Sequence, residues 1–122
     1  MAKKILIVDD SRTVRQQVGF TLSKEGFELI EAEDGKDGIE KLKANKDIGM
    51  ILSDVNMPRM DGLTMVEEIR KMEEFKSLPI IMLTTESSGD KVDRAKKVGA
   101  SGWLVKPFNP EQLVGAVKKL TR

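Results

Sequence analysis

The sequence predicts an α/β fold in which a five-stranded parallel sheet is covered by helices on both faces. Short, continuously apolar runs bounded by Gly, Pro or acidic residues are typical of strands that are buried on both sides. Longer segments with apolar residues at helical spacing separate these runs, so that five strands alternate with five helices. This alternation indicates βαβ units, and 122 residues are enough for one such domain with its own core.

The N-terminal part of the chain contains the first strand, helix and strand. Lys3–Val8 is a β-branched apolar run that ends at Asp9. Arg12–Glu25 carries valine and leucine residues every four positions, which predicts a helix, and Gly26 is placed to end it. Phe27–Ala32 is the second predicted strand, because an acidic turn with a glycine follows it.

The central part continues the alternation. Lys36–Ala44 is a short predicted helix with two apolar residues on one side. Met50–Ser53 follows Gly49 and is too short for a helix, so we expect a buried strand. Gly62–Glu74 follows an Asp-Gly breaker and has a line of apolar residues, which predicts one continuous helix.

The C-terminal part adds two strands and two helices. Leu78–Thr84 is the fourth predicted strand, with a proline that is tolerated at its start. Ser88–Val98 is a mostly charged, weakly amphipathic predicted helix, and Gly102–Val105 is the fifth strand. Asn109 as N-cap and Pro110 at the first helical position begin the last helix.

The composition narrows the range of functions. The chain has no cysteine and no histidine, which excludes disulfides, thiolate metal sites and histidine-based triads. Its 21 basic and 20 acidic residues nearly balance, so nothing indicates a nucleic acid or a membrane surface as a partner. The run Ile5–Val8 is too short for a signal peptide, and no run could span a membrane. We therefore expect a cytoplasmic protein.

Charged and polar residues stand at the carboxyl ends of the predicted strands. Asp9 and Asp10 follow the first strand, Asp54 follows the third, Thr84 ends the fourth and Lys106 follows the fifth. Because parallel strands end at one edge of the sheet, where such folds bind ligands, we expect these side chains to converge. One aspartate at a strand end more often caps a turn, but several together favour a site.

Two further sets of residues lie near the same edge. Thr85 follows the fourth strand beside its last residue. Glu31 and Glu33 belong to the end of the second strand, and their distance from the other acids depends on the order of the strands in the sheet. The alternative for all of these acids is a solvated position in a turn.

Three neighbouring carboxylates require a cation, unless one of them stays protonated. Two carboxylates about 4 Å apart repel by roughly 4 kcal/mol at an effective dielectric constant of about 20. Only oxygen ligands are available, which favours Mg²⁺, an ion that usually shares a phosphate oxygen. Lys106 is suited to hold that phosphate, and a carboxylate beside Mg²⁺ can act as a nucleophile toward phosphorus. No GxxxxGK[ST] phosphate loop is present, so the phosphoryl group must come from a separate donor.

Four short segments carry a resemblance to a known family. They are Val8-Asp9-Asp10-Ser11, Asp54 with Met57-Pro58-Arg59-Met60-Asp61-Gly62, Thr84-Thr85-Glu86 and Lys106-Pro107-Phe108. In this order and at these spacings, the chain resembles the receiver domains of bacterial two-component response regulators, most closely the single-domain chemotaxis regulators of the CheY type. The resemblance covers residues 1–122. It implies one receiver domain with a doubly wound, flavodoxin-like sheet in the order 2-1-3-4-5, which is the order known for CheY.

The resemblance also implies roles for the residues at the strand ends. Asp54 accepts a phosphoryl group from a histidine kinase, and Lys106 pairs with that group. Asp10 and Asp54 ligate Mg²⁺ together with the backbone carbonyl of Asn56, while Asp9 acts through a metal-bound water.

A second set of implied roles concerns switching and dephosphorylation. Thr84 moves its hydroxyl onto the phosphoryl group and Trp103 turns inward in response, although position 103 more often holds Tyr or Phe and indole must fit the same gap. The alternative is that Trp103 is a half-buried surface residue of its strand. Asn56 and Glu86 tune the loss of phosphate, and the peptide between Lys106 and Pro107 is expected to be cis.

The partners implied by the resemblance are a histidine kinase of the CheA type, a phosphatase, and the flagellar motor switch protein or another output protein. We expect a monomer that is not an enzyme but a stoichiometric phosphoacceptor, which assists its own phosphorylation and dephosphorylation. The expected output is binding in trans through Ser88–Val98, the strand with Trp103 and the helix from Pro110. The alternative for Ser88–Val98 is a solvated helix without a partner.

Two alternative functions remain open. One is a phosphorelay intermediate that passes its phosphate to a histidine phosphotransferase. The other is a Mg²⁺-dependent phosphatase with Asp54 as nucleophile, for which Glu86 is the only candidate general acid that the sequence suggests.

Overall fold

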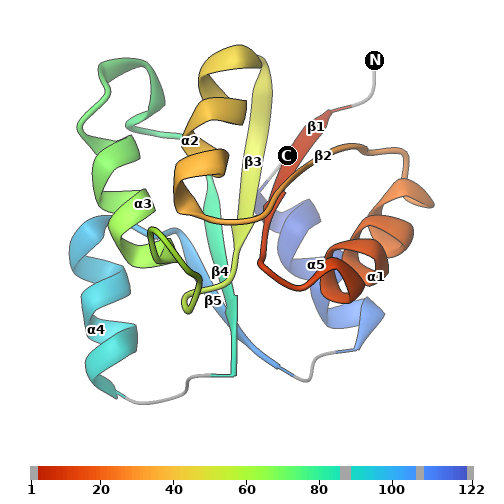
Figure 1. Ribbon diagram of the computed structural model, residues 1–122. Helices are drawn as coiled ribbons and strands as arrows, with labels where there is room; N and C mark the ends of the chain where they lie inside the picture. Colours follow the sequence, from red (N-terminus) through yellow and green to blue (C-terminus); the bar gives the residue numbers. More distant parts are fainter. Residues whose placement is uncertain (1–2, 86–88, 107–108, 121–122) are drawn as a thin grey trace.

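Five parallel strands form a single sheet in the order β2-β1-β3-β4-β5 (Figure 1). The structure, a computed structural model, describes residues 3–85, 89–106 and 109–120. The strands are β1 (Lys4–Val8), β2 (Glu28–Ala32), β3 (Ile48–Ser53), β4 (Ile80–Thr84) and β5 (Gly102–Val105). The order confirms the predicted doubly wound sheet, in which β1 and β3 are central neighbours and β2 and β5 are the edges.

Helices cover both faces of this sheet. They are α1 (Arg12–Ser23), α2 (Gly35–Ala44), α3 (Gly62–Arg70), α4 (Gly89–Val98) and α5 (Pro110–Leu120), with a short 3₁₀ helix η1 at Glu73–Phe75. Figure 1 shows α1 and α5 on one face and α2, α3 and α4 on the other. None of the helices in the described part of the chain is long and apolar enough to cross a lipid bilayer.

The hydrophobic core has two layers, one on each face of the sheet. In β1, Leu6 and Val8 contribute to the layer under α2, α3 and α4, whereas Ile5 and Ile7 contribute to the layer under α1 and α5. All four side chains are at most 1% exposed. Alternate residues of a strand point to opposite faces, so a strand between two helical layers must be apolar at every position.

Two predicted boundaries were wrong because of local packing. The helix predicted to reach Glu74 ends at Arg70, and the chain then turns so that Phe75 enters the core at 4% exposure. The Arg70 guanidinium donates a hydrogen bond to the Phe75 carbonyl at 2.7 Å, which fixes this break. The third strand begins at Ile48 instead of Met50, because the register shift between Lys4 and Ile5 accommodates Gly49 within the strand.

The other elements agree with the predicted ranges within a few residues at each end. α1 ends at Ser23, two residues before the predicted end, and Gly26 follows in a left-handed conformation with φ of 90°. The N-terminal residue of the predicted helix Ser88–Val98 lies outside the described residues.

Candidate functional site

The sheet brings the predicted aspartates together at its carboxyl edge. Val8 pairs with Ser53 in the register of β1 and β3, so the residues that follow them are neighbours. The Asp54 backbone N–H donates to the Val8 carbonyl at 2.9 Å. As a result, carboxylate oxygens of Asp9, Asp10 and Asp54 all lie within 4.8 Å of one another.

The three aspartates differ in their exposure to solvent. Asp9 is 2% exposed, Asp54 is half-buried and Asp10 is exposed. One oxygen of Asp9 accepts a hydrogen bond from the Ser11 backbone N–H at 2.8 Å, and one oxygen of Asp54 accepts from the Val55 N–H at 2.7 Å. These bonds orient both carboxylates and leave their Oδ2 atoms directed toward the same cation.

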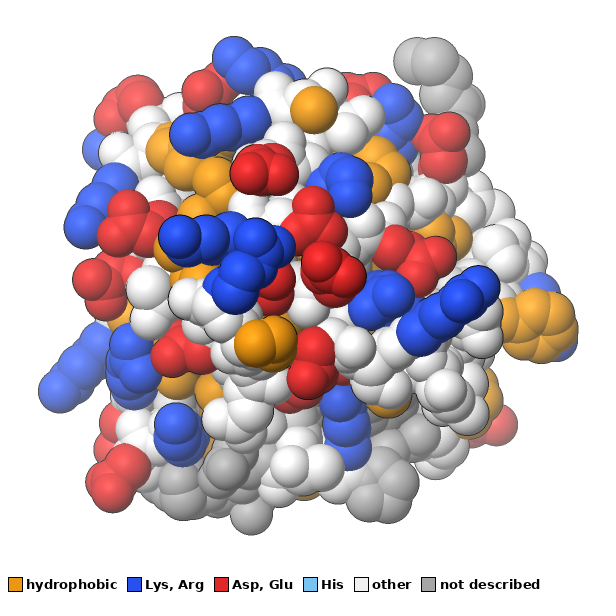
Figure 2. Space-filling model, viewed as in Figure 1, with side chains coloured by type: hydrophobic (Ala, Val, Ile, Leu, Met, Phe, Trp, Pro, Cys, Tyr) orange, Lys and Arg blue, Asp and Glu red, His pale blue; other side chains and the backbone are white. Residues whose placement is uncertain are grey.

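That cation is the side chain of Lys106, which follows the edge strand β5. Its Nζ lies 3.1 Å from Asp9 Oδ2 and 3.9 Å from Asp54 Oδ2. The backbone N–H of Lys106 donates to the Thr84 carbonyl at 2.8 Å, which extends the pairing of β4 and β5 to this residue. Figure 2 shows acidic side chains grouped in the middle of the face viewed in Figure 1, with Lys and Arg side chains on either side.

Burial and charge act in opposite directions on Asp54. Its burial raises the pKa of its carboxyl above the usual value, the Lys106 ammonium lowers it, and the negative charges of Asp9 and Asp10 raise it further. The net effect is a raised pKa. A bound cation among the three aspartates would reverse this balance by stabilising the ionised form.

The donor chemistry of the cluster fits Mg²⁺. Asp9, Asp10 and Asp54 present only oxygen atoms, and one of them is exposed while two are wholly or partly buried. A hard ion that uses few carboxylates and retains waters suits such an open edge. Lys106 lies beside Asp54, so its ammonium would offer an anionic substrate oxygen a second positive charge in addition to the metal ion.

The two predicted switch residues lie on neighbouring strands. Thr84 is completely buried at the end of β4, and Trp103 on β5 pairs with Met82, two residues earlier on β4. The Trp103 indole is half-buried and packs against the core layer under α2, α3 and α4. Its Nε1 is buried, and no acceptor for it lies within hydrogen-bond distance among the described residues.

Several predicted residues do not belong to this cluster. Glu31 lies on the edge strand β2, where its carboxylate forms an ion pair with Arg15 at 2.9 Å. Glu33 and Thr85 are exposed, and the metal cluster found within the described ranges contains neither glutamate. Glu86 and Pro107 fall outside the described residues, so the general-acid and cis-peptide predictions stay predictions.

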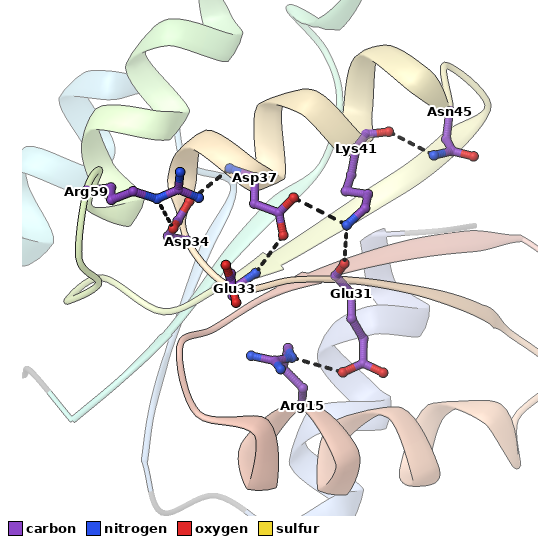
Figure 3. A network of polar contacts seen from close by, with 8 residues as sticks. All are labelled: Arg15, Glu31, Glu33, Asp34, Asp37, Lys41, Asn45 and Arg59. Atoms are coloured by element: carbon purple, nitrogen blue, oxygen red, sulfur yellow. Dashed lines mark hydrogen bonds and ion pairs between the residues drawn. The ribbon is translucent and has the colours of Figure 1, made fainter.

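A polar network beside the cluster was missed in the sequence (Figure 3). Arg15 donates to the Asp9 carbonyl at 2.5 Å and holds Glu31, which ties α1 to β1 and β2. Asp34 caps α2 and forms an ion pair with Arg59 at 2.6 Å. The capping role of Asp34 could have been predicted, because an aspartate before a helical segment is a typical N-cap. Its pairing with Arg59, which lies 25 residues further along the chain, follows from no local sequence pattern.

Comparison with known protein families establishes the family to which the chain belongs. The sequence profile of the response regulator receiver domain matches residues 5–118. The chain belongs to this family. Its three aspartates and Lys106 therefore occupy the carboxyl edge of a receiver domain.

The similar receiver proteins include chemotaxis regulators. CheY1 of Helicobacter pylori is 46% identical over 111 residues, which cover 90% of this chain and 90% of CheY1. The CheY homolog of Campylobacter jejuni is 40% identical over 111 residues, which cover 90% of this chain and 85% of the homolog. The solved structure of the chemotaxis response regulator CheY4 of Vibrio cholerae is 44% identical, with a TM-score of 0.92, and the match covers 98% of this chain and 99% of the other.

Proposed function

We propose that Asp54 accepts a phosphoryl group from a histidine kinase in a Mg²⁺-dependent reaction, and that the modified chain acts by binding a partner protein. The observation that carries this proposal is the placement of Asp54 within 4.8 Å of two other aspartates and 3.9 Å from Lys106. Structural roles alone do not account for three converging carboxylates, because their mutual repulsion destabilises the fold.

In the proposed reaction, a carboxylate oxygen of Asp54 attacks phosphorus while the bond between phosphorus and the donor breaks. The donor leaves with the electrons of that bond, and an acyl phosphate forms on Asp54. Lys106 stabilises the negative charge on the transferred oxygens. Mg²⁺, held by Asp10, Asp54 and the Asn56 carbonyl, would supply further charge stabilisation, with Asp9 acting through a metal-bound water.

The output of the proposed switch begins with charge. Phosphorylation changes the charge at Asp54 from −1 to about −2, which favours movement of the Thr84 hydroxyl and of Trp103. The surface formed by α4, β5 and α5 would then bind its partner with altered affinity. Since the similar proteins above are named chemotaxis proteins, we propose the flagellar motor switch as this partner and a CheA-type enzyme as the kinase.

The proposal describes a regulator and not a catalyst of multiple turnovers. It treats residues 1–122 as one monomeric, cytoplasmic receiver domain in which Asn56 and Glu86 set the lifetime of the phosphate. A phosphatase would be a further partner.

The phosphorylation step is tested by the intact mass of the protein after incubation with acetyl phosphate. We expect the mass of one phosphoryl group to be added to the wild-type chain in the presence of Mg²⁺. Omission of Mg²⁺ or the substitution Asp54→Ala should abolish the addition. A chain that binds Mg²⁺ and gains no mass would contradict the proposal.

The output is tested with the phosphorylated protein. Stronger binding to a purified motor switch protein supports the chemotaxis function. Transfer of the phosphate to a histidine phosphotransferase would instead identify a phosphorelay intermediate. Repeated hydrolysis of a small phosphoester would identify a phosphatase.

A further inference from the structure

The loop between β3 and α3 is held by two sets of contacts, one at its base and one near its middle. It follows Asp54 directly and carries Asn56, and the Gly62 N–H donates to the Val55 carbonyl at 2.8 Å to close its base. The middle of the loop contains Arg59, which has a left-handed conformation with φ of 63°. This conformation is unfavourable for a residue with a β-carbon, so contacts elsewhere must hold it.

Arg59 is held by an aspartate at the start of α2. Its Nε donates to Asp34 Oδ2 at 2.6 Å, and Asp34 Oδ1 accepts from the Asp37 backbone N–H at 2.9 Å (Figure 3). The side chain of Asp34 is only 3% exposed, while that of Arg59 is 56% exposed. One carboxylate oxygen of Asp34 therefore caps the helix, and the other binds the loop.

A backbone contact lies beside this ion pair. The Gly35 N–H donates to the Met60 carbonyl at 3.0 Å. A β-carbon at position 35 would lie 2.7 Å from that oxygen and 2.7 Å from the Met60 side chain, so only glycine allows the loop to pack this closely on α2. The start of α2 thus forms a fixed surface on which the loop rests.

We propose that Asp34 and Arg59 are positioning residues, which fix the loop after Asp54 so that the Asn56 carbonyl and the Asp54 carboxylate can bind one cation together. This inference rests on the proposed Mg²⁺ site and adds two residues to it, neither of which is placed to touch the ion. Groups that orient metal ligands from the second layer affect metal affinity strongly, because a misplaced ligand loses its bond.

If Arg59 acted only through its charge, its removal would change Mg²⁺ affinity in the opposite direction. A guanidinium near a cation site repels the cation, so its removal should strengthen Mg²⁺ binding if only electrostatics mattered. Loss of positioning should weaken Mg²⁺ binding. The sign of the change in the Arg59 variant therefore separates the two explanations.

Two substitutions remove the ion pair and retain the local backbone. Arg59→Gly deletes the guanidinium and favours the left-handed conformation already present. Asp34→Asn deletes the charge, and asparagine remains a good N-cap for α2. Lys118→Gln, which removes the ion pair between Lys118 and Glu25 at 2.7 Å, is the matched control.

The experiment is a calorimetric titration of each purified chain with MgCl₂, together with its melting temperature in EDTA. We expect Arg59→Gly and Asp34→Asn each to weaken Mg²⁺ binding by about tenfold, as is typical for groups that orient metal ligands. The double variant should be no weaker than the single variants, because one interaction is lost in all three. Lys118→Gln should bind Mg²⁺ as the wild type does.

Three results would overturn the inference. In the first, both variants bind Mg²⁺ with wild-type affinity although their melting temperatures fall, which would leave the pair with a structural role only. In the second, Arg59→Gly binds Mg²⁺ more tightly than the wild type. In the third, the wild-type chain binds no Mg²⁺, which would also remove the metal site of the proposed function and is distinguished by the wild-type titration alone.

Discussion

Lys106 Nζ lies closer to Asp9 than to Asp54, at 3.1 Å from Asp9 Oδ2 and 3.9 Å from Asp54 Oδ2. The lysine thus compensates the most buried aspartate of the cluster and remains near the one proposed to accept phosphate. A positive charge in this position competes with a metal ion for the same carboxylates. It would also favour the proposed transfer of a phosphoryl group to Asp54.

The substitution Lys106→Met should therefore change two properties in opposite directions. We expect Mg²⁺ to bind several-fold more tightly, because a competing cation near Asp54 is lost. Phosphorylation by acetyl phosphate should slow by about 10²-fold, because the transferred oxygens lose a stabilising charge. Calorimetry and the rate of mass addition measure the two effects, and Lys43→Met on the exposed side of α2 is the control. An unchanged rate would contradict the role of Lys106.

The raised pKa of Asp54 predicts a conflict between stability and function. The folded chain binds the Asp54 proton more tightly than the unfolded chain, so ionisation of this carboxyl costs stability at every pH above its folded pKa. Asp54→Asn, and Asp10→Ala by the same relief of repulsion, should raise the melting temperature at pH 7 in EDTA.

The gain from Asp54→Asn should depend on pH. It should grow as the pH rises through the raised pKa of the folded chain, and it should disappear below the ordinary carboxyl pKa of 3.8, where Asp54 is protonated in both states. Lys106 retains Asp9 as a partner in this variant. Scanning calorimetry across this range measures the effect, with Asp93→Asn on α4 as control, and a lower melting temperature at pH 7 would argue against the clustered geometry.

The lowered pKa of Asp34 predicts the opposite pH dependence. Burial alone would raise the pKa, but hydrogen bonds from Arg59 and from backbone N–H groups outweigh it. This carboxylate stabilises the fold above its ordinary pKa, and the stabilisation is lost as the pH falls through its lower folded value. Asp34→Asn should therefore lower the melting temperature at pH 7 and have no effect at strongly acidic pH. A deficit that is independent of pH would indicate that the charge of Asp34 is unimportant.

Close packing next to the Asp54 backbone leaves no space for a side chain at Gly62. A β-carbon at this position would collide with the Asp54 carbonyl oxygen and would lie 2.8 Å from the Met82 side chain. Gly62→Ala should lower stability by about 1–3 kcal/mol or more and displace the Asp54 backbone. Denaturant unfolding and the rate of phosphorylation test the two consequences. Gly115→Ala is the control, because nothing lies within 4 Å of a β-carbon there.

Trp103 predicts an unusual tolerance to substitution. A buried donor without a partner costs about 1–3 kcal/mol, and no partner of its Nε1 is found in the described ranges. Trp103→Phe removes this donor and also some apolar contact area, at about 25 cal/mol per Å². We expect unchanged or increased stability in denaturant unfolding. A loss of several kcal/mol would contradict this expectation.

Much of this fold could be predicted because each element has a local cause. The central strands β1, β3 and β4 are apolar at almost every position, and the aspartates follow strands whose ends a parallel sheet must bring together. The end of α3 and the start of β3 could not be predicted, since they depend on where Phe75 enters the core and on a register shift beside Gly49.

The contacts that surround the candidate site were predicted less well than its central residues. Asp9, Asp54 and Lys106 were placed by topology alone. The pairing of Arg59 with Asp34 depends on the path of a loop in three dimensions, and the burial of Trp103 Nε1 depends on how β5 packs against its neighbours. Sequence patterns describe neither.

The proposed role of Asp54 is tested most directly by locating the acyl phosphate. The wild-type protein would be incubated with acetyl phosphate and Mg²⁺ and reduced with borohydride, which converts an aspartyl phosphate to homoserine, and its peptides would be analysed by mass spectrometry. The account predicts homoserine at position 54 and at neither Asp9 nor Asp10. Homoserine at Asp9 or Asp10, or its absence from all three positions in a chain that binds Mg²⁺, would contradict it.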